Sequence, residues 1–188
     1  MAINIINTEI KDVFIIEPKV FKDDRGYFME TFNANDLFAN GVITSNSRFV
    51  QDNESESSYG VVRGLHMQMP PFSQAKLVRV VHGCVLDVAV DVRPGSSTFG
   101  KHVAVELSDE NKRQLYIPRN FLHGFAVLSD KARFLYKVDN VYNKQSEFGI
   151  RFDDPQIGID WKIPAEKIIT SEKDRLANTL QDLLQRLK

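Results

Sequence analysis

Apolar and polar residues alternate with a period of two over many short segments of the chain. In residues 83–92, cysteine, leucine and valine at every second position alternate with a set that contains Asp87 and Asp91. This pattern is typical of a strand with one apolar face and one face that carries carboxylates. Similar patterns predict further strands at residues 13–16, 27–32, 76–81, 101–107, 124–128 and 132–138. Roughly ten short strands separated by turns predict an all-β sandwich or barrel.

Two segments depart from this pattern and predict helices. Residues 33–40 begin with Asn33 as a cap and are followed by Gly41, which predicts a short helix between strands. Near the end of the chain, leucines recur at helical spacing after the cap-like Ser171 and Asp174, at positions 176, 180, 183, 184 and 187. We therefore expect a C-terminal amphipathic helix whose leucine face packs on the sheet or on a second subunit.

The size and charge of the chain narrow the class of protein. Its 188 residues suffice for one domain, which we expect to span residues 1–188. With 24 Lys and Arg residues against 25 Asp and Glu residues, the chain lacks the positive excess that nucleic-acid binding needs. Cys84 is the only cysteine, which fits a reducing compartment, and we expect it to be a buried small apolar residue. No signal-peptide pattern or long apolar run is present, so we expect a soluble cytoplasmic protein without a membrane partner.

The segment RGLH at residues 63–66 combines an arginine, a glycine and a histidine after two valines. On a straight strand Arg63 and His66 would face opposite ways, so both reach one cavity only if Gly64 bends the chain. A neutral, partly buried His66 could accept a proton near pH 7. The alternative is an ordinary hydrogen-bonded core histidine.

A second histidine, His123, lies between apolar residues in the segment 117–125 (IPRNFLHGF). Proline and histidine on an all-β chain suggest a cupin-like barrel, whose metal-binding members supply several histidines and a glutamate. Here His66 is followed by Met67 and Gln68, and His82 and His102 stand alone. Since the spacing of a metal-ligand set is missing, we expect no metal.

Lys76 and Tyr136 are polar residues within otherwise apolar strand patterns. Lys76 shares a predicted strand face with Val78 and Val80. If that face is the barrel interior, its ammonium must serve an anion or a developing oxyanion; on the outside it is ordinary surface charge. Tyr136 can place its phenol in the same interior as a proton donor, or it can be a core tyrosine.

The charged turn before residues 27–32 offers a weaker signal. Arg25 follows two aspartates and precedes Gly26, after which come two aromatic residues and then Glu30. Arginine binds phosphate with two parallel hydrogen bonds, and aromatic rings stack on nucleobases. A charged turn leading into an edge strand would look the same.

Taken together, these segments resemble the dTDP-4-dehydrorhamnose 3,5-epimerase family, and the resemblance runs over nearly the whole chain. Their order and spacing carry it more than any single motif does. The segments are EPKVF at 17–21, DRGYF at 24–28, FVQDN at 49–53, RGLH at 63–66, KLVR at 76–79, DVAVD at 87–91, STFG at 97–100, IP at 117–118, HGF at 123–125, FLYK at 134–137 and DPQIGIDW at 154–161.

The resemblance implies a jelly-roll, cupin-like β-barrel with short helices and a C-terminal helix, working as a homodimer that shares N-terminal strands. It implies a cofactor-independent epimerase that inverts C3 and C5 of a dTDP-4-keto-6-deoxy sugar. In that scheme His66 is the base, Tyr136 the acid on the opposite face, Asp174 the carboxylate that orients His66, and Lys76 the residue facing the sugar O4. Nucleotide and sugar would be held by Arg25, Glu30, Gln51, Asn53, Arg63, His123 and Glu147.

Some alternatives stay open at this point. Asp174 has a local explanation, because Ser171 and Asp174 could simply cap the last helix. Similar proteins commonly carry two adjacent tyrosines after the Tyr136 strand, whereas this chain has Val141 and Tyr142. A relative that inverts only one carbon, a non-catalytic sugar-nucleotide-binding cupin and a metal-dependent cupin oxygenase are the competing functions.

Overall fold

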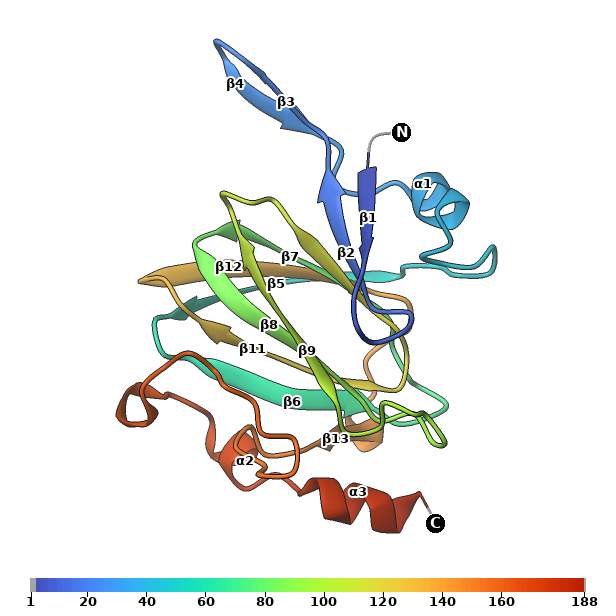
Figure 1. Ribbon diagram of the computed structural model, residues 1–188, viewed down its shortest axis with the longest axis vertical. Coiled ribbons are helices and arrows are strands. Elements are labelled where there is room, and N and C mark those ends of the chain that lie inside the picture. Colours follow the sequence, from blue (N-terminus) through green and yellow to red (C-terminus); the bar gives the residue numbers. More distant parts are fainter. Residues whose placement is uncertain (1–2, 188) are drawn as a thin grey trace.

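The computed structural model describes residues 3–187, in which two antiparallel β-sheets face each other (Figure 1). The six-stranded sheet has the order β1 (Ile3–Asn7), β2 (Phe14–Pro18), β10 (Gln114–Ile117), β7 (Lys76–His82), β12 (Lys131–Val138) and β5 (Gln51–Ser58). The five-stranded sheet has the order β13 (Glu147–Gly149), β6 (Val62–Gln68), β11 (Phe121–Val127), β8 (Cys84–Asp91) and β9 (His102–Ser108). From β5 to β13 the chain passes repeatedly from one sheet to the other, with β8 and β9 as the one consecutive pair in the same sheet, which confirms the jelly-roll, cupin-like class.

The space between the sheets is filled by apolar side chains from both. Val78 and Phe134 of the six-stranded sheet belong to the same buried cluster as Val85 and Phe125 of the five-stranded sheet. The rings of Phe125 and Phe134 stack with their centroids 4.3 Å apart. This apolar core fixes the separation of the sheets, and hence the width of any cavity between them.

Strand β8 is buried on both faces, which the alternation of its residues did not reveal. Its carboxylates Asp87 and Asp91 are both fully buried, and each is held by a polar partner. Cys84 at its start is only half-buried, so the expectation of a buried thiol is wrong. Burial, assisted by Glu106, raises the pKa of this thiol to about 11.

The outer faces of both sheets are covered in part by other segments. On the six-stranded sheet, helix α1 (Ala34–Ala39) inserts Leu37 into a cluster with Ile16, Leu77 and Tyr116. On the five-stranded sheet, the C-terminal segment contributes Trp161, Leu180 and Leu183. Two 3₁₀ turns, η1 (Lys144–Ser146) and η2 (Ala165–Lys167), lie in the connections. No helix within residues 3–187 is long and apolar enough to cross a membrane.

The predicted C-terminal helix is two short helices, α2 (Glu172–Arg175) and α3 (Leu180–Arg186). Between them Asn178 pairs with Ile150, and Thr179 forms a capping box with Asp182 that starts a new helix. Leu180 and Leu183 pack on the sheet as expected, whereas Leu176 is 75% exposed. The leucine spacing therefore predicted the packed face correctly but not the break.

A two-stranded ribbon, β3 (Val20–Asp23) and β4 (Gly26–Met29), projects away from the barrel (Figure 1). The strand predicted at residues 27–32 therefore ends at Met29, three residues early. Phe21, Tyr27 and Phe28 on this ribbon are exposed at 49%, 54% and 70%. A projecting ribbon with exposed aromatic rings is a surface that a second molecule can cover.

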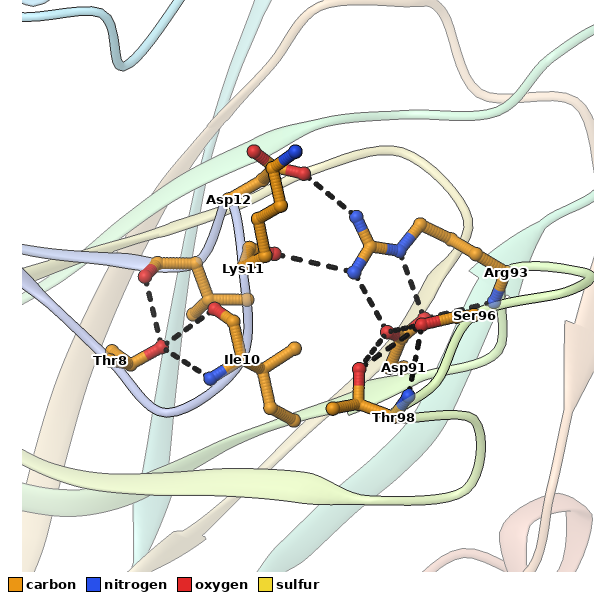
Figure 2. Close-up of polar contacts among 9 residues, drawn as sticks. Thr8, Ile10, Lys11, Asp12, Asp91, Arg93, Ser96 and Thr98 are labelled. Atoms are coloured by element: carbon orange, nitrogen blue, oxygen red, sulfur yellow. Dashed lines mark hydrogen bonds and ion pairs between the residues drawn. The ribbon is translucent and has the colours of Figure 1, made fainter.

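The turn between β1 and β2 is tied to the barrel by an ionic network centred on the buried Asp91 (Figure 2). Arg93 donates to both carboxylate oxygens of Asp91 and also to Asp12 in the turn. Ser96 and Thr98 donate to Asp91 as well. Although burial opposes ionisation, these hydrogen bonds lower the pKa of Asp91 to about 2.

Candidate active site

A cavity of about 620 Å³ opens between the two sheets at the end of the interior where the apolar core gives way to polar side chains. This volume is in the range of small-molecule binding sites. Seven of the residues predicted from the sequence line it: Arg63, His66, Lys76, His123, Tyr136, Glu147 and Asp174. They come from both sheets and from α2, so the fold brings together residues that are far apart in the sequence.

Arg63 and His66 both line this cavity because β6 contains an irregularity between them. His66 pairs with His123 and Arg63 pairs with Phe125, so two residues of β6 lie opposite Gly124 alone. Such a bulge lets residues three apart face the same side. Gly64 has φ +123°, and a Cβ built on it would lie 2.6 Å from the Cα of Gly124. The bend expected at Gly64 is thus confirmed.

His66 and Asp174 form a hydrogen-bonded pair at the cavity wall. The His66 Nε2 lies 2.6 Å from Asp174 Oδ1, and the other carboxylate oxygen accepts from the Gly64 N–H at 3.4 Å. The Asp174 side chain is 6% exposed and that of His66 is 31% exposed. Burial opposes ionisation of Asp174, but the contact with His66 brings its pKa below the usual value. With Nε2 directed at a carboxylate, Nδ1 is the ring nitrogen that can accept a proton.

Both explanations of Asp174 apply at once. The Ser171 hydroxyl accepts a hydrogen bond from the Asp174 backbone N–H, so Ser171 caps α2. The Asp174 carboxylate turns instead toward β6 and His66. The short helix thereby fixes the position of the carboxylate beside the histidine.

Lys76 and His123 lie side by side on opposite sheets. Lys76 Nζ is 3.4 Å from His123 Nδ1, and His123 Nε2 is 3.0 Å from Asp87 Oδ2. Burial lowers the pKa of Lys76 to about 8, although the carboxylates of Asp87 and Glu147 act against that shift. A pKa of about 8 leaves the lysine mainly cationic at pH 7. The strand face of Lys76 is therefore the interior one.

Tyr136 reaches the cavity from β12 in the six-stranded sheet, whereas His66 belongs to β6 in the five-stranded sheet. Burial raises the pKa of the Tyr136 phenol, with Arg63 acting in the opposite direction. The phenol thus holds its proton at neutral pH. A molecule bound between the sheets would have an imidazole from one sheet and a phenol from the other.

The cavity mouth holds a cluster of Tyr142, Glu147 and Lys173. Lys173 Nζ lies 2.5 Å from one Glu147 oxygen, and the Tyr142 hydroxyl donates to the other at 3.0 Å. These contacts lower the pKa of Glu147 against the effect of burial. Sequence reasoning missed Lys173, because a lysine in a short surface helix carries no distinctive signal. Val141 is outside the cavity lining, whereas Tyr142 is part of it.

Four predicted site residues lie outside the cavity lining. Gln51 and Asn53 are on the edge strand β5, where Asn53 pairs with Tyr136, and the Gln51 amide donates to Asn53 at 2.8 Å. Arg25 is at the tip of the β3–β4 ribbon and pairs with Asp23, and Glu30 follows the ribbon and accepts from Asn33. Arg25 and Glu30 therefore do not line the cavity of their own chain.

Within residues 3–187 no group of three or more His, Cys, Asp and Glu side chains is arranged to hold a metal ion. The polar groups of the cavity are instead paired with one another, as histidine with carboxylate and lysine with histidine. This is an arrangement suited to moving protons.

Known proteins resemble this chain over most of its length. The model of the dTDP-4-dehydrorhamnose 3,5-epimerase family matches residues 7–182. A dTDP-4-dehydrorhamnose 3,5-epimerase of Shigella flexneri is 56% identical over 91% of this chain and 92% of its own. A dTDP-6-deoxy-D-glucose-3,5-epimerase from Legionella pneumophila shares 51% sequence identity with this chain. Its crystal structure in complex with dTDP-4-keto-L-rhamnose superposes with a TM-score of 0.91 and covers 95% of this chain and 93% of its own. A 3'-monoepimerase from Streptomyces bikiniensis with dTDP-quinovose is 30% identical, with a TM-score of 0.85 over 96% of this chain and 89% of that one. The chain belongs to the dTDP-4-dehydrorhamnose 3,5-epimerase family.

Proposed function

We propose that this enzyme inverts C3 and C5 of dTDP-4-dehydro-6-deoxy-D-glucose to give dTDP-4-dehydro-L-rhamnose. The observation that carries this is the placement of a paired histidine and a neutral phenol on opposite walls of one cavity, with a half-buried lysine on the same sheet as the phenol. A ketone at C4 acidifies the hydrogens on both neighbouring carbons, because either carbanion delocalises onto the carbonyl oxygen. Inversion then needs a base on one face of the sugar and an acid on the other.

In this proposal His66 removes the proton and Tyr136 returns one from the opposite face. The His66 Nδ1 takes the proton, and the developing imidazolium is stabilised by Asp174 at 2.6 Å from Nε2. Lys76 donates to the C4 oxygen as it becomes an enolate oxygen, and its charge is effective because burial removes much of the water around the ammonium. No step in this scheme transfers electrons, so it needs no redox cofactor, and the charge that stabilises the enolate is supplied by Lys76.

The same proposal assigns the remaining polar residues to binding. Arg63 at the cavity wall and Glu147 at its mouth would hold the sugar and the diphosphate, and His123 would contribute to the same site through its contact with Lys76. Gln51 and Asn53 lie beside the strand of Tyr136 and would extend this surface. Support for a nucleotide-linked ligand comes from the Legionella structure, which contains a dTDP sugar.

We also propose that the enzyme is a homodimer in which the ribbon of one subunit reaches the cavity of the other. The ribbon carries Arg25 and three exposed aromatic residues, and Tyr142 and Ile169 at the partner cavity are exposed at 55% and 54%. Covering both apolar surfaces would remove them from water. Arg25 and Glu30 would then reach the bound nucleotide from the second subunit.

Intersubunit complementation tests the dimer. The variants Arg25→Ala and His66→Asn should each be nearly inactive alone, but mixed dimers should regain part of the wild-type activity because one site of each dimer is intact. A protein that sediments as a monomer, or mixtures that show no recovery after exchange of subunits, would refute the shared site.

The epimerase function is tested by product analysis. The wild-type enzyme should convert dTDP-4-keto-6-deoxyglucose to a product inverted at both carbons, as read by NMR. His66→Asn should slow this by at least about 10²-fold, the lower end of the contribution of a positioned base. The matched control is His82→Asn, since His82 is exposed and pairs with Asp109 away from the cavity. A product inverted at one carbon only would favour the single-centre relative, and no turnover would favour a binding protein.

A further inference from the structure

Behind His123, on the side away from the cavity, lies a buried carboxylate for which the reaction scheme has no role. Asp87 on β8 is fully buried and is not part of the cavity lining. Its Oδ2 is 3.0 Å from His123 Nε2, while Oδ1 has no hydrogen-bond partner within residues 3–187. A buried carboxylate with one free oxygen is costly to the fold, so it requires an explanation.

The hydrogen-bond chain from the cavity to Asp87 fixes the protons on His123. Lys76 Nζ can only donate, so the His123 Nδ1 at 3.4 Å must accept. Nε2 then carries the ring proton and donates it to Asp87. Burial lowers the pKa of His123, which keeps the ring neutral although Asp87 acts in the opposite direction. A neutral ring with its proton on Nε2 is the one form that satisfies both contacts.

The charge of Asp87 also acts on Lys76. Burial lowers the pKa of this lysine to about 8, and the Asp87 carboxylate is the largest influence in the opposite direction, followed by Glu147. The other ionisable groups around the cavity are Arg63 and His66 of β6, His123 of β11 and Tyr136 of β12, with Lys173 and Asp174 of α2. Within residues 3–187 the Asp87 carboxylate contacts no cationic side chain, because its hydrogen bond is to a neutral histidine.

We propose that Asp87 is a positioning residue that holds His123 in the Nε2–H form and, through that ring, keeps the Lys76 ammonium charged and directed at the sugar. Two N–H groups of Lys76 remain free for the C4 oxygen when the third is held by His123. This inference deepens the proposed function and rests on it for the role of Lys76. Its local part, the effect of Asp87 on His123 and Lys76, is independent of any substrate.

The form of the His123 ring can be measured in the wild-type enzyme without any substitution. Nitrogen-15 NMR of the histidine side chains distinguishes a protonated Nε2 from a protonated Nδ1. We expect His123 to be neutral with its proton on Nε2 at pH 7. A proton on Nδ1, or on both nitrogens, would overturn the proposal.

The variant Asp87→Asn tests the charge, because it keeps the size of the side chain and an oxygen that can accept from Nε2. Trace acetylation followed by mass spectrometry of the Lys76 peptide gives the midpoint of lysine deprotonation, since only the neutral amine reacts. A charge acting through an effective dielectric of about 20 across one imidazole ring shifts a pKa by roughly one unit. We therefore expect the midpoint to fall by about one pH unit in Asp87→Asn.

The matched control is Asp91→Asn, which removes a second fully buried carboxylate from the same strand and the same face. Asp91 contacts Arg93, Ser96 and Thr98, far from Lys76, so the midpoint should stay at its wild-type value even if the protein is less stable. In turnover assays, the activity of Asp87→Asn should begin to fall at a lower pH than that of the wild-type enzyme. The activity of Asp91→Asn should fall at the same pH as that of the wild-type enzyme.

The outcomes separate this inference from the proposed function. An unchanged Lys76 midpoint in Asp87→Asn would overturn the role of Asp87, even in an active epimerase. A wild-type enzyme without activity on the 4-keto sugar would refute the proposed function, while the midpoint and the His123 proton would still decide the local claim.

Discussion

Replacing Gly64 with alanine tests whether the bulge in β6 creates the active-site geometry. Gly64 has φ +123°, a conformation that side-chain-bearing residues rarely adopt, and its added Cβ would lie 2.6 Å from Gly124 Cα and 2.8 Å from the His123 carbonyl oxygen. Backbone strain of this kind costs about 1–3 kcal/mol, and an overpacked contact that backbone cannot relieve costs about 1–3 kcal/mol more. The expected loss of stability is thus about 2–6 kcal/mol.

The contribution of the contact can be separated from that of the backbone by a control glycine. Gly95 also has a positive φ, +76°, but a Cβ added there meets nothing within 4 Å. At about 2–4 °C per kcal/mol for a chain of this size, Gly64→Ala should lower the melting temperature by roughly 10 °C and Gly95→Ala by roughly 3 °C.

Thermal unfolding measured by circular dichroism provides the comparison, with turnover measured well below both melting temperatures. Gly64→Ala should also lose at least about tenfold in kcat, because Arg63 and His66 no longer face the cavity together. Equal melting temperatures for the two variants, or full activity of Gly64→Ala, would refute the bulge as the device that positions these side chains.

Three further predictions concern charged groups. Asp174→Asn should lower kcat roughly 10²-fold in steady-state assays, because a charged hydrogen bond contributes about 1.5–3 kcal/mol and the amide can also favour the wrong histidine tautomer; a loss below about threefold would contradict the pairing with His66. The kcat/KM of the wild-type enzyme should fall as pH rises through about 8, because Lys76 loses its proton there, and Lys76→Arg should move that limb to higher pH; a limb that stays in place would show that another group titrates. The pKa of Asp91 is lowered to about 2, so its stabilisation is present above pH 4 and is lost as pH falls toward 2. Urea unfolding should accordingly show Asp91→Asn less stable than wild type by about 2 kcal/mol at pH 7, with the gap closing toward pH 2; a gap that does not change with pH would refute this account of Asp91.

Period-two patterns predicted β2, β4, β7, β8, β9, β11 and β12, and they missed β1, β3, β5, β6, β10 and β13. The physical reason is plainest for β5. Residues 51–58 are polar throughout, because their outward face carries acidic residues that pair with Lys137 and Arg133 of β12. An edge strand stabilised by ion pairs has no hydrophobic signal to detect. The break between α2 and α3 was missed for a different reason, because Thr179 makes a capping box inside a run of helical leucine spacing.

For the site, residue chemistry singled out His66, Lys76 and Tyr136, but it could not say where their side chains lie in the fold. Apart from the weak phosphate signal of Arg25, the roles of the other site residues came from the family resemblance alone. Whether Lys76 faced inward depended on the pairing of β7 with β10 and β12, which the sequence does not reveal. Asp87 was visible only as one of two carboxylates on a strand, and its link to His123 required β8 and β11 to be neighbours. The reach of Arg25 and Glu30 into the cavity of a second subunit stays a proposal. A single domain and a cytoplasmic location stay predictions of the sequence.

The central claim is that the cavity exchanges protons at both carbons beside the ketone. Incubating the enzyme with dTDP-4-keto-6-deoxyglucose in deuterated water and following the sugar by NMR measures this directly. The account predicts deuterium at C3 and at C5, dependent on His66. Exchange at one carbon alone would contradict the double inversion, and exchange at neither would contradict the epimerase itself.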